Sequence, residues 1–362
     1  MTKGTDLVLA GQAEVTQLGW RPPEEGLELN EWLELGRQLA MIEQATQWVI
    51  GDWWAYGVER GYGEGKELAA TAGIDYGTVR VYASVARSYG MLTRVNSLSF
   101  KHHRLVAGRD DRDEWLGRAE VEGWSSGRLS AEVKATDQAA RDLERSTRAG
   151  GRATVERAEA VEWLGTLADA SVDLLLTDPP YSTDVGDINA FAAWLVEAQR
   201  VVRPTGRMVV FHGRYPDEVG AYLNVAARTG WEHELAVWHY ADTLGPSPTG
   251  RLKTTHQSML VVHGPEAPDL HTTALVDRQS CFVVPMNQEA GGRWFPWQKP
   301  QLLAERLVAT FAPPGGTVVD PFAGAGTFLV AAAALGRQAA GCDLDQDRIG
   351  ECRRRGVEVV YR

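Results

Sequence analysis

Apolar residues recur at helical spacing through most of the first 150 positions of the chain. The spacing predicts helices over residues 28–60, over 66–88 with a break at Gly73, over 101–122 and over 128–145. The polar stretch 141–151 ends in Arg-Ala-Gly-Gly and is the predicted linker. We therefore expect an all-α N-terminal domain over residues 1–150.

The pattern changes after residue 152, where short β-rich runs alternate with helical ones. Strands are predicted over residues 172–177, 207–211, 258–263, 317–320 and 338–343, and helices over 188–202, 300–312 and 327–335. Strands that alternate with helices build parallel sheets with helices on both faces. Residues 151–362 therefore predict an α/β domain with a doubly wound, Rossmann-like sheet, which binds ligands at the carboxyl ends of its strands.

Composition narrows the class of protein further. The chain has 362 residues, of which 44% are hydrophobic and 23% charged, which is typical of two globular domains. Its three cysteines form no CxxC pair, so neither a structural zinc site nor a disulfide framework is indicated. No apolar run is long enough to span a bilayer, and the N-terminus lacks a signal-peptide core. These features predict a soluble, reduced, cytoplasmic protein that holds no metal.

Charge is unevenly distributed along the chain. The formal net charge is −11, and residues 1–65 carry 4 basic and 11 acidic side chains. Residues 66–110 carry 7 basic and 3 acidic side chains, a local charge of +4. A basic island in an acidic chain is either a nucleic-acid footprint or a solvated face, and charge alone leaves both interpretations open.

The most specific motif is TDPPY at residues 177–181, directly after a predicted apolar strand. Asp178 is therefore expected at the carboxyl end of that strand, where α/β active sites lie. The two prolines fix φ at about −65°, so the turn can aim a carboxylate and a backbone carbonyl at one point. These groups could hold an exocyclic base amine while Tyr181 stacks on the base. The alternative is a strand that ends in a Pro-Pro turn with a surface tyrosine.

A second motif, DPFAGAGT at residues 320–327, lies between a predicted strand and an alanine-rich helix. Its glycines let the backbone approach a ligand closely, and the helix N-terminus offers unpaired N–H groups. The spacing matches neither GxGxxG nor GxxxxGK(S/T), which disfavours phosphate binding. One strand later, Asp343 is positioned to accept hydrogen bonds from ribose hydroxyls. Together these features suggest an adenosyl cofactor without a diphosphate, such as S-adenosylmethionine (SAM).

Over residues 153–356 the chain resembles the amino-methylating DNA methyltransferases, which modify N6 of adenine or N4 of cytosine. The resemblance rests on SVDLLLTDPPY (171–181), RVVRPTGRMVVF (200–211), QKPQLLAERLV (298–308) and GGTVVDPFAGAGT (315–327). The order of the motifs, with the catalytic one before the cofactor one, resembles the β class of that family. Two departures are Ala325, where the family usually has Ser, and Glu159, where it usually has Asp.

The resemblance implies direct methyl transfer from SAM to the amine of a base that has been flipped out of the duplex. In that reaction the Asp178 carboxylate and the Pro179 carbonyl accept the N–H bonds of the amine as its positive charge develops. The residues that the resemblance marks as catalytic are Asp178, Pro179, Pro180 and Tyr181. Those that it marks as cofactor-binding are Glu159, Lys299, Asp320, Phe322, Gly324, Gly326, Thr327 and Asp343.

The target base is the main open choice. An Asp at the start of the catalytic motif is more typical of the adenine enzymes of this family, so N6 of adenine is expected. The first alternative is N4 of cytosine. The others are a non-catalytic DNA-binding regulator on a methyltransferase scaffold and an RNA base methyltransferase, in which the cofactor motif normally comes first.

Residues 65–88 fit a helix-turn-helix, whose second helix enters the major groove of DNA. Residues 66–134 also resemble the helix-turn-helix region of ParB-type proteins, in LSFKHH (98–103) and GWS (123–125). The expected base or phosphate contacts are Thr78, Arg80, Ser84 and Arg87. Helical hairpins of this kind also serve packing alone. His102 and His103 are expected at the surface.

Residues 240–296 lie where the β class carries its target-recognition elements, and Arg251 and Lys253 are candidate phosphate contacts there. The partners that this interpretation allows are double-stranded DNA, a separate restriction subunit of a restriction-modification system, and a second copy of the chain in a homodimer. A membrane is not among them.

Overall fold

The computed structural model describes residues 7–8, 14–16, 19–21, 45–61, 65–71, 73–181, 184, 186–213, 216–240, 249–250, 252–286 and 298–361. The chain forms two compact units, Met1–Ser130 and Ala131–Arg362, each of which is described by itself. Within the described ranges, no helix is long and apolar enough to cross a membrane.

The first unit is mainly helical. Its elements are the short antiparallel strands β1 (Leu7–Val8), β2 (Glu14–Thr16) and β3 (Gly19–Arg21), a helix over residues 45–59, α2 (Lys66–Thr71), α3 (Tyr76–Ser88), η2 (Met91–Thr93), α4 (Phe100–Val106) and α5 (Arg112–Val121). The strands are an addition to the all-α domain expected from the sequence. The single helix expected over 101–122 is two helices, and α5 begins after Asp111, whose carboxylate accepts a hydrogen bond from the Trp115 indole (3.0 Å).

Residues 66–88 form two helices with a break at Gly73, as predicted. Gly73 has a φ of +74°, a left-handed conformation that glycine adopts without strain. α3 begins after Asp75, whose carboxylate accepts a hydrogen bond from the Thr78 backbone N–H (2.8 Å). Val79 and Ala83 of α3 pack in a small core with Ala69 of α2 and Trp54 of the helix over residues 45–59. The pair therefore has the local form of a helix-turn-helix.

His102 and His103 are buried, so the expectation that they lie at the surface is wrong. The backbone N–H of Val95 donates to Nε2 of His103 (3.0 Å), and Nδ1 of the same ring lies 3.0 Å from the Ser99 carbonyl oxygen. Trp48 packs edge-on against the ring, with centroids 5.1 Å apart. The two polar contacts satisfy the imidazole inside the core, which the helical pattern alone could not reveal.

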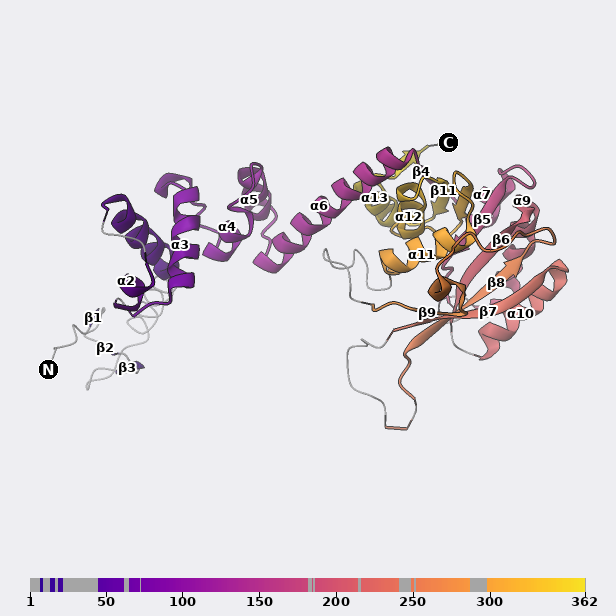
Figure 1. The fold of residues 1–362 in the computed structure, drawn as a ribbon, viewed down its shortest axis with the longest axis horizontal. Coiled ribbons are helices and arrows are strands. Elements are labelled where there is room, and N and C mark those ends of the chain that lie inside the picture. Colours follow the sequence, from indigo (N-terminus) through magenta and orange to yellow (C-terminus); the bar gives the residue numbers. More distant parts are fainter. Residues whose placement is uncertain are drawn as a thin grey trace. The chain divides into compact units, whose positions relative to one another are not determined.

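The second unit is built on a nine-stranded sheet with the order β12-β4-β11-β10-β5-β6-β8-β7-β9 (Figure 1). Its strands are β4 (Arg152–Arg157), β5 (Val172–Thr177), β6 (Val202–His212), β7 (Glu232–His239), β8 (His256–His263), β9 (Cys281–Val283), β10 (Thr317–Asp320), β11 (Gln338–Asp343) and β12 (Glu358–Val360). From β12 to β6 all neighbours are parallel, whereas β8 pairs antiparallel with both β6 and β7. The predicted doubly wound α/β fold is confirmed.

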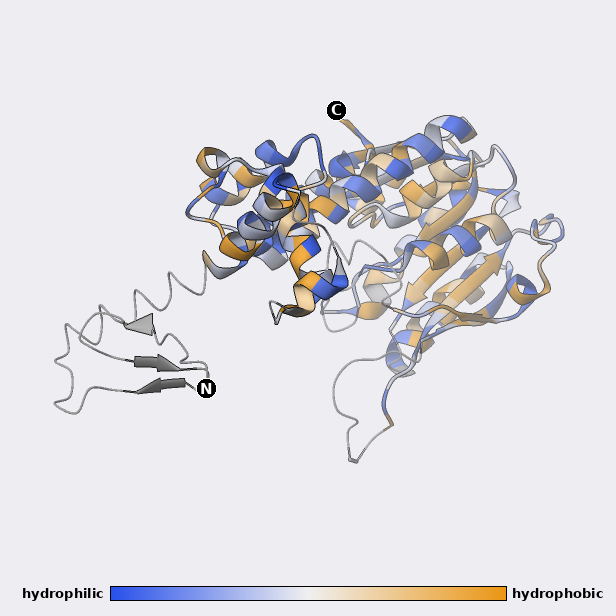
Figure 2. Ribbon diagram, turned by 60° about the vertical axis from the view of Figure 1, so that its left-hand side comes forward, coloured by the Kyte–Doolittle hydropathy of each residue, from blue (hydrophilic) through white to orange (hydrophobic). Residues whose placement is uncertain are grey.

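Helices cover both faces of this sheet. One layer consists of α7 (Ala160–Gly165), α8 (Ile188–Phe191), α9 (Trp194–Val201) and α10 (Pro216–Thr229), and the other of α11 (Gln301–Phe311), α12 (Thr327–Ala334) and α13 (Gln346–Arg354). In β5, Leu174 and Leu176 face the core under α11 and α12, and Leu175 faces the core under α9. Burial on both faces explains why the central strands are continuously apolar, as their colouring in Figure 2 shows.

The linker expected over residues 141–151 is instead the end of a long helix, α6 (Ser126–Ala149). Asp142 of α6 is buried in the second unit, and Arg145 forms an ion pair with Glu305 of α11 (2.8 Å). A Cβ on Gly336 would lie 2.8 Å from the Ala149 carbonyl oxygen, so the two backbones touch directly. The polar residues of the expected linker thus find partners in the second unit, and the units divide after residue 130 and not after residue 150.

Candidate active site

The carboxyl ends of β5 and β10 lie side by side in the centre of the sheet. Val318 of β10 pairs with Leu174 of β5, and Val319 pairs with Leu175. β5 continues to β6 on one side and β10 to β11 on the other, so the chain direction across the sheet reverses between them. Ligands of doubly wound sheets bind at this switch point. The TDPPY turn (177–181) and the glycine turn (320–327) therefore meet there.

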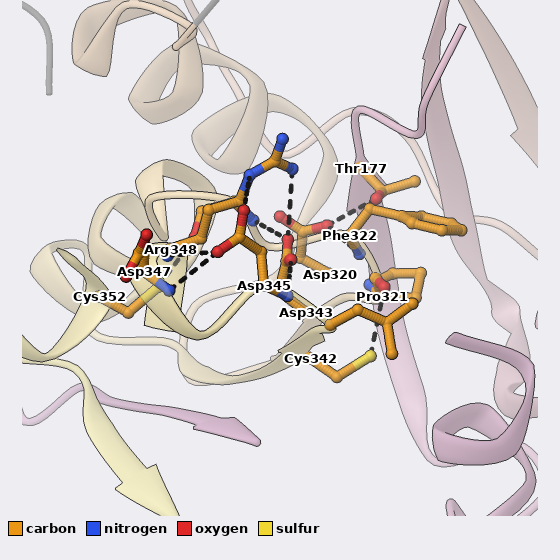
Figure 3. Close-up of polar contacts among 12 residues, drawn as sticks. Thr177, Asp320, Pro321, Phe322, Cys342, Asp343, Asp345, Asp347, Arg348 and Cys352 are labelled. Atoms are coloured by element: carbon orange, nitrogen blue, oxygen red, sulfur yellow. Dashed lines mark hydrogen bonds and ion pairs between the residues drawn. The ribbon is translucent and has the colours of Figure 1, made fainter. Parts of the chain in front are cut away.

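A buried hydrogen bond joins the two turns. The Thr177 hydroxyl donates to Asp320 Oδ1 (2.6 Å), although the two residues are 143 positions apart in the sequence. The Phe322 backbone N–H donates to the same oxygen (3.1 Å), and Figure 3 shows the carboxylate between these two donors. Burial raises the pKa of Asp320 to about 7, because the charged form loses its hydration.

A cavity of about 310 Å³ opens between the two turns. The residues that line it are Asp178, Gln298, Lys299, Asp320, Phe322, Ala323, Gly324, Ala325, Thr327, Phe328 and Arg348. Its volume is at the lower end of small-molecule sites. The lining combines two carboxyl groups, two cationic side chains and two aromatic rings, which suits a ligand that has both charged and flat aromatic parts.

The glycine turn is hydrogen-bonded to the end of β11. Gly324 and Gly326 have φ of +53° and +74°, and α12 begins directly after Gly326. The Gly324 N–H donates to Asp343 Oδ2 (2.8 Å), and the Asp345 N–H donates to the other oxygen (2.9 Å) (Figure 3). A Cβ on Gly326 would lie 2.9 Å from the Cys352 sulfur, so the turn has no room for a side chain there.

Both carboxylate oxygens of Asp178 accept hydrogen bonds. The Tyr181 hydroxyl donates to Oδ1 (2.8 Å), and the Lys299 ammonium donates to Oδ2. Nε2 of Gln257 on β8 donates to the Tyr181 hydroxyl oxygen (2.7 Å) and lies 3.4 Å from Asp178 Oδ1. Burial and the neighbouring Asp178 charge hold the pKa of Tyr181 well above its usual value, so the phenol remains a neutral donor.

Lys299 is buried, and its ammonium lies 3.2 Å from the Tyr181 hydroxyl and 5.0 Å from the centre of the Phe211 ring. A buried cation needs a partner of opposite charge, and Asp178 supplies it. Lys299 was expected among the cofactor residues. It lines the cavity, and its ammonium contacts the carboxylate of the TDPPY turn.

The other expected cofactor residues divide into two groups. Besides Lys299, the cavity is lined by Asp320, Phe322, Gly324 and Thr327. Gly326 and Asp343 support the turn but are not among the lining residues. Glu159 is not among them either: its carboxylate caps α7 by accepting hydrogen bonds from the Val161 (2.7 Å) and Glu162 (3.0 Å) N–H groups.

Gln257 and Arg348 belong to the site although no motif in the sequence predicts them. Gln257 reaches Asp178 because β8 enters the sheet next to β6, out of chain order, and no motif marks it. Arg348 of α13 lines the cavity and lies 3.8 Å from the Asp343 carboxylate. Its position five residues after the end of β11 is the one signal that could have drawn attention to it.

The candidate DNA contacts lie mainly on α3. Arg80, Ser84 and Arg87 are exposed, whereas Thr78 is half-buried and its hydroxyl donates to Asp75 (3.1 Å). Lys253 is half-buried in the segment before β8. Arg251 lies outside the described residues, as do residues 241–248 and 287–297 of the expected target-recognition region.

Comparison with known families gives one match across the second unit. The profile of the N6/N4 methyltransferase family, described as DNA methylase, matches residues 172–352, which is half of the chain. Both the TDPPY turn and the glycine turn lie inside the matched region.

Solved structures that are similar to the chain include the following three. The cytosine-N4-specific DNA methyltransferase PvuII has a TM-score of 0.50 at 18% identity, over 58% of this chain and 89% of that one. A SAM complex of a protein from Thermus thermophilus described as a DNA modification methylase has a TM-score of 0.46 at 27% identity, over 58% and 98%. The M1.HpyAVI–SAM complex has a TM-score of 0.48 at 19% identity, over 57% and 99%. The likeness to the PvuII enzyme concerns the fold alone.

A curated relative is the transcriptional regulator NovE of Streptomyces niveus. It is 35% identical over 127 residues, which cover 34% of this chain and 57% of NovE. The chain therefore spans little more than half the length of this relative.

Proposed function

The chain belongs to the N6/N4 DNA methylase family, and we propose that it methylates N6 of adenine in double-stranded DNA. It is a SAM-dependent DNA methyltransferase. The observation that carries the proposal of amine methylation is the position of Asp178, whose carboxylate lines the same cavity as the glycine turn. A base amine held by Asp178 therefore lies next to a ligand in that cavity. The choice of adenine over cytosine rests on the Asp at the start of the TDPPY motif.

The cavity suits SAM chemically. The cofactor carries a sulfonium and an ammonium, and the carboxyl group of Asp320 in the cavity wall can balance positive charge there, while Asp178 is paired with Lys299. The rings of Phe322 and Phe328 offer apolar surface to an adenine ring. When bound, SAM supplies a methyl group on a positively charged sulfur, which makes the carbon electrophilic.

The role that we propose for the TDPPY turn is to localise the lone pair of the target amine. Asp178 and the Pro179 carbonyl would accept its two N–H bonds and stabilise the positive charge that develops on nitrogen. Holding the amine beside the methyl group supplies further rate through proximity. Pro180 keeps the turn rigid, since its ring fixes φ.

Tyr181 has to move before it can stack on a flipped base, because its hydroxyl now donates to Asp178. When the amine takes up the Asp178 carboxylate, the phenol loses that acceptor and its ring is released toward the entering base. Gln257 accompanies this change, since it donates to the same hydroxyl oxygen.

Methyl transfer from labelled SAM to unmethylated duplex DNA, followed by nucleoside analysis, tests the proposal. N6-methyladenine is the expected product. Detection of N4-methylcytosine instead would show that cytosine is the target base. Asp178→Ala should lower turnover by about 10³-fold, while the Kd for SAM stays within about threefold of the wild-type value. Transfer to RNA and not to duplex DNA, or SAM binding without transfer, would contradict the proposal.

We further propose that the first unit binds DNA through α3. The support is the helix pair over residues 66–88 and the exposed side chains of Arg80, Ser84 and Arg87 on its second helix. NovE, a transcriptional regulator, is consistent with such a role without assigning it. Lys253 and Arg251 remain predicted phosphate contacts of the second unit.

The double variant Arg80→Ala/Arg87→Ala tests the role of α3. Its DNA affinity should fall about tenfold or more, with a smaller dependence of affinity on salt, because two cationic contacts are lost. Arg148→Gln is the matched control, since Arg148 is an exposed arginine of α6 that pairs with Glu144. Equal DNA affinity of the double variant and the control would refute the assignment.

The remaining partners stay predictions. A separate restriction subunit, a homodimer and a cytoplasmic location are all compatible with a DNA methyltransferase. Size-exclusion chromatography with and without DNA tests whether the chain forms a homodimer.

A further inference from the structure

Two parts of the cofactor region lie outside the family match. The match covers residues 172–352, so α6 and Arg355, the residue that caps the C-terminus of α13, are features of this chain and not of the matched family region. Arg355 contacts the glycine turn directly, and α6 contacts α11, which is linked to Arg355.

Arg355 is buried and holds the glycine turn directly. Its Nη1 donates to the Ala325 carbonyl oxygen (3.0 Å) and to the Thr327 hydroxyl (2.9 Å). Ala325 and Thr327 both line the cavity, whereas Arg355 is not among the lining residues. One guanidinium nitrogen thus sets the distance between the turn and the first residue of α12.

The same guanidinium is linked to α6 through α11. Its Nη2 donates to Gln301 Oε1 (2.8 Å), and the amide nitrogen of Gln301 donates to Glu305 (3.3 Å). Glu305 forms the ion pair with Arg145 of α6. Each step in this series is a hydrogen bond or an ion pair, so a continuous polar network joins α6 to the cavity wall (Figure 1 shows the elements).

Asp142 is a second charged residue of α6 at this interface. Its side chain is buried, with Gln138 donating to Oδ1 (3.0 Å), and Oδ2 has no hydrogen-bond partner among the described residues. Burial raises the pKa of Asp142, and the charge of Arg355 opposes that shift. Asp142 Oδ1 also lies 3.9 Å from Nη1 of Arg145, so Asp142 joins the same network through the Arg145–Glu305 pair.

We propose that Arg355 is a positioning residue for the cofactor, and that α6 braces it through Asp142 and the Arg145–Glu305–Gln301 series. The inference rests on SAM as the cofactor of the proposed methyltransferase. The brace holds the Ala325 carbonyl and the Thr327 hydroxyl in the cavity wall, so its loss changes the affinity for SAM and not the chemistry at Asp178.

The test uses the full chain and measures the Kd for SAM by calorimetry without DNA, then kcat and both KM values. Arg355→Lys keeps the charge, but a single ammonium cannot reach both the glycine turn and Gln301, so the Kd and KM for SAM should rise about tenfold. Glu305→Gln and Asp142→Asn should raise them about threefold, within the range of coupling between linked groups. In all three variants kcat at saturating SAM and KM for DNA should stay within about twofold of wild type.

Arg148→Gln is the control for a change of charge on α6 and should bind SAM like the wild type. A Kd for SAM within twofold of wild type in folded Arg355→Lys overturns the role of Arg355. Wild-type affinity for SAM in both Glu305→Gln and Asp142→Asn overturns the role of α6. If Arg355→Lys does not fold, these two variants test whether the network affects SAM binding. Because SAM binding is measured without DNA, a protein that binds SAM yet methylates no DNA contradicts the proposed function and leaves this test intact.

Discussion

At the scale of single residues, the site depends on charged groups that are buried but paired. Asp178 and Lys299 neutralise each other in the cavity wall, and Asp320 is held between two hydrogen-bond donors. Burying a charge costs free energy unless a partner or a proton compensates it. The cavity is therefore a place where protonation and ligand binding are coupled.

Asp320 makes this coupling measurable. Its pKa is 3.8 as a free side chain and about 7 in the folded protein, so the folded state binds the proton more tightly. Its contribution to stability is therefore present below pH 3.8, decreases as the pH rises toward 7, and is a penalty above that pH. Asp320→Asn should raise the melting temperature more at pH 8 than at pH 5, and the gain should vanish below pH 3.8, as measured by thermal unfolding.

The same variant should lose affinity for SAM, because a cationic ligand favours the ionised carboxylate. In the wild type, SAM affinity should fall as the pH decreases below about 7, and in Asp320→Asn this dependence should disappear. Asp169→Asn is a control, since Asp169 is an exposed partner of Arg200. A wild-type SAM affinity that is flat between pH 6 and 8 would argue against the assignment.

Lys299 gives a second prediction at this scale. Lys299→Met removes the cation that pairs with Asp178 and leaves the carboxylate to Tyr181 and Gln257. We expect turnover to fall about tenfold, because a charge-assisted hydrogen bond that orients Asp178 is lost. Lys134→Met, at an exposed position of α6, serves as the control lysine. A rise in turnover would show instead that the ammonium competes with the target amine for Asp178.

At the scale of elements, α4 and the loop before it depend on the neutral form of His103. The ring nitrogen that accepts the Val95 N–H cannot do so when it is protonated. Burial lowers the pKa of His103 below 6.5, so its contribution to stability is complete above pH 6.5 and is lost as the pH falls from 6.5 toward the folded value.

Hydrogen exchange can resolve this effect within the first unit. Amide protection in α3 and α4 should decrease between pH 7 and pH 5.5 after correction for intrinsic exchange rates. The reason is that His103 binds a proton more readily in the open state than in the closed one, so a lower pH favours opening. In His103→Gln, which offers an acceptor but does not titrate, the decrease should be smaller. Identical pH dependence in both proteins would exclude His103 as the cause.

At the scale of the whole molecule, α6 belongs to both units along the chain, since it begins at Ser126 and ends at Ala149. A fragment of residues 131–362 keeps Asp142 and Arg145, and a fragment of 151–362 lacks them. We expect the shorter fragment to melt at least about 5 °C lower, because it exposes the surface on which α6 packs. Differential scanning calorimetry of the two fragments tests this, and equal melting temperatures would return the boundary to residue 150.

The fold could be predicted where short-range rules apply. Apolar runs predicted β5 and β10, and the left-handed break at Gly73 followed from glycine between two helical patterns. The TDPPY and DPFAGAGT stretches were recognisable because proline and glycine restrict the backbone locally, whatever surrounds them. The predictions for His103 and for the 141–151 stretch were wrong because their polar atoms are satisfied by partners that the local pattern does not reveal.

The sequence by itself therefore determined the motifs, most of the elements and the class of the sheet, since each depends on residues within one or two turns of each other. The tertiary structure alone decided that Thr177 contacts Asp320, that Lys299 and Gln257 converge on Asp178, and that α6 reaches the glycine turn through Arg355. These contacts depend on which strands pair and which helices pack on them. Pairing of that kind is set by burial over the whole domain, and no local pattern encodes it.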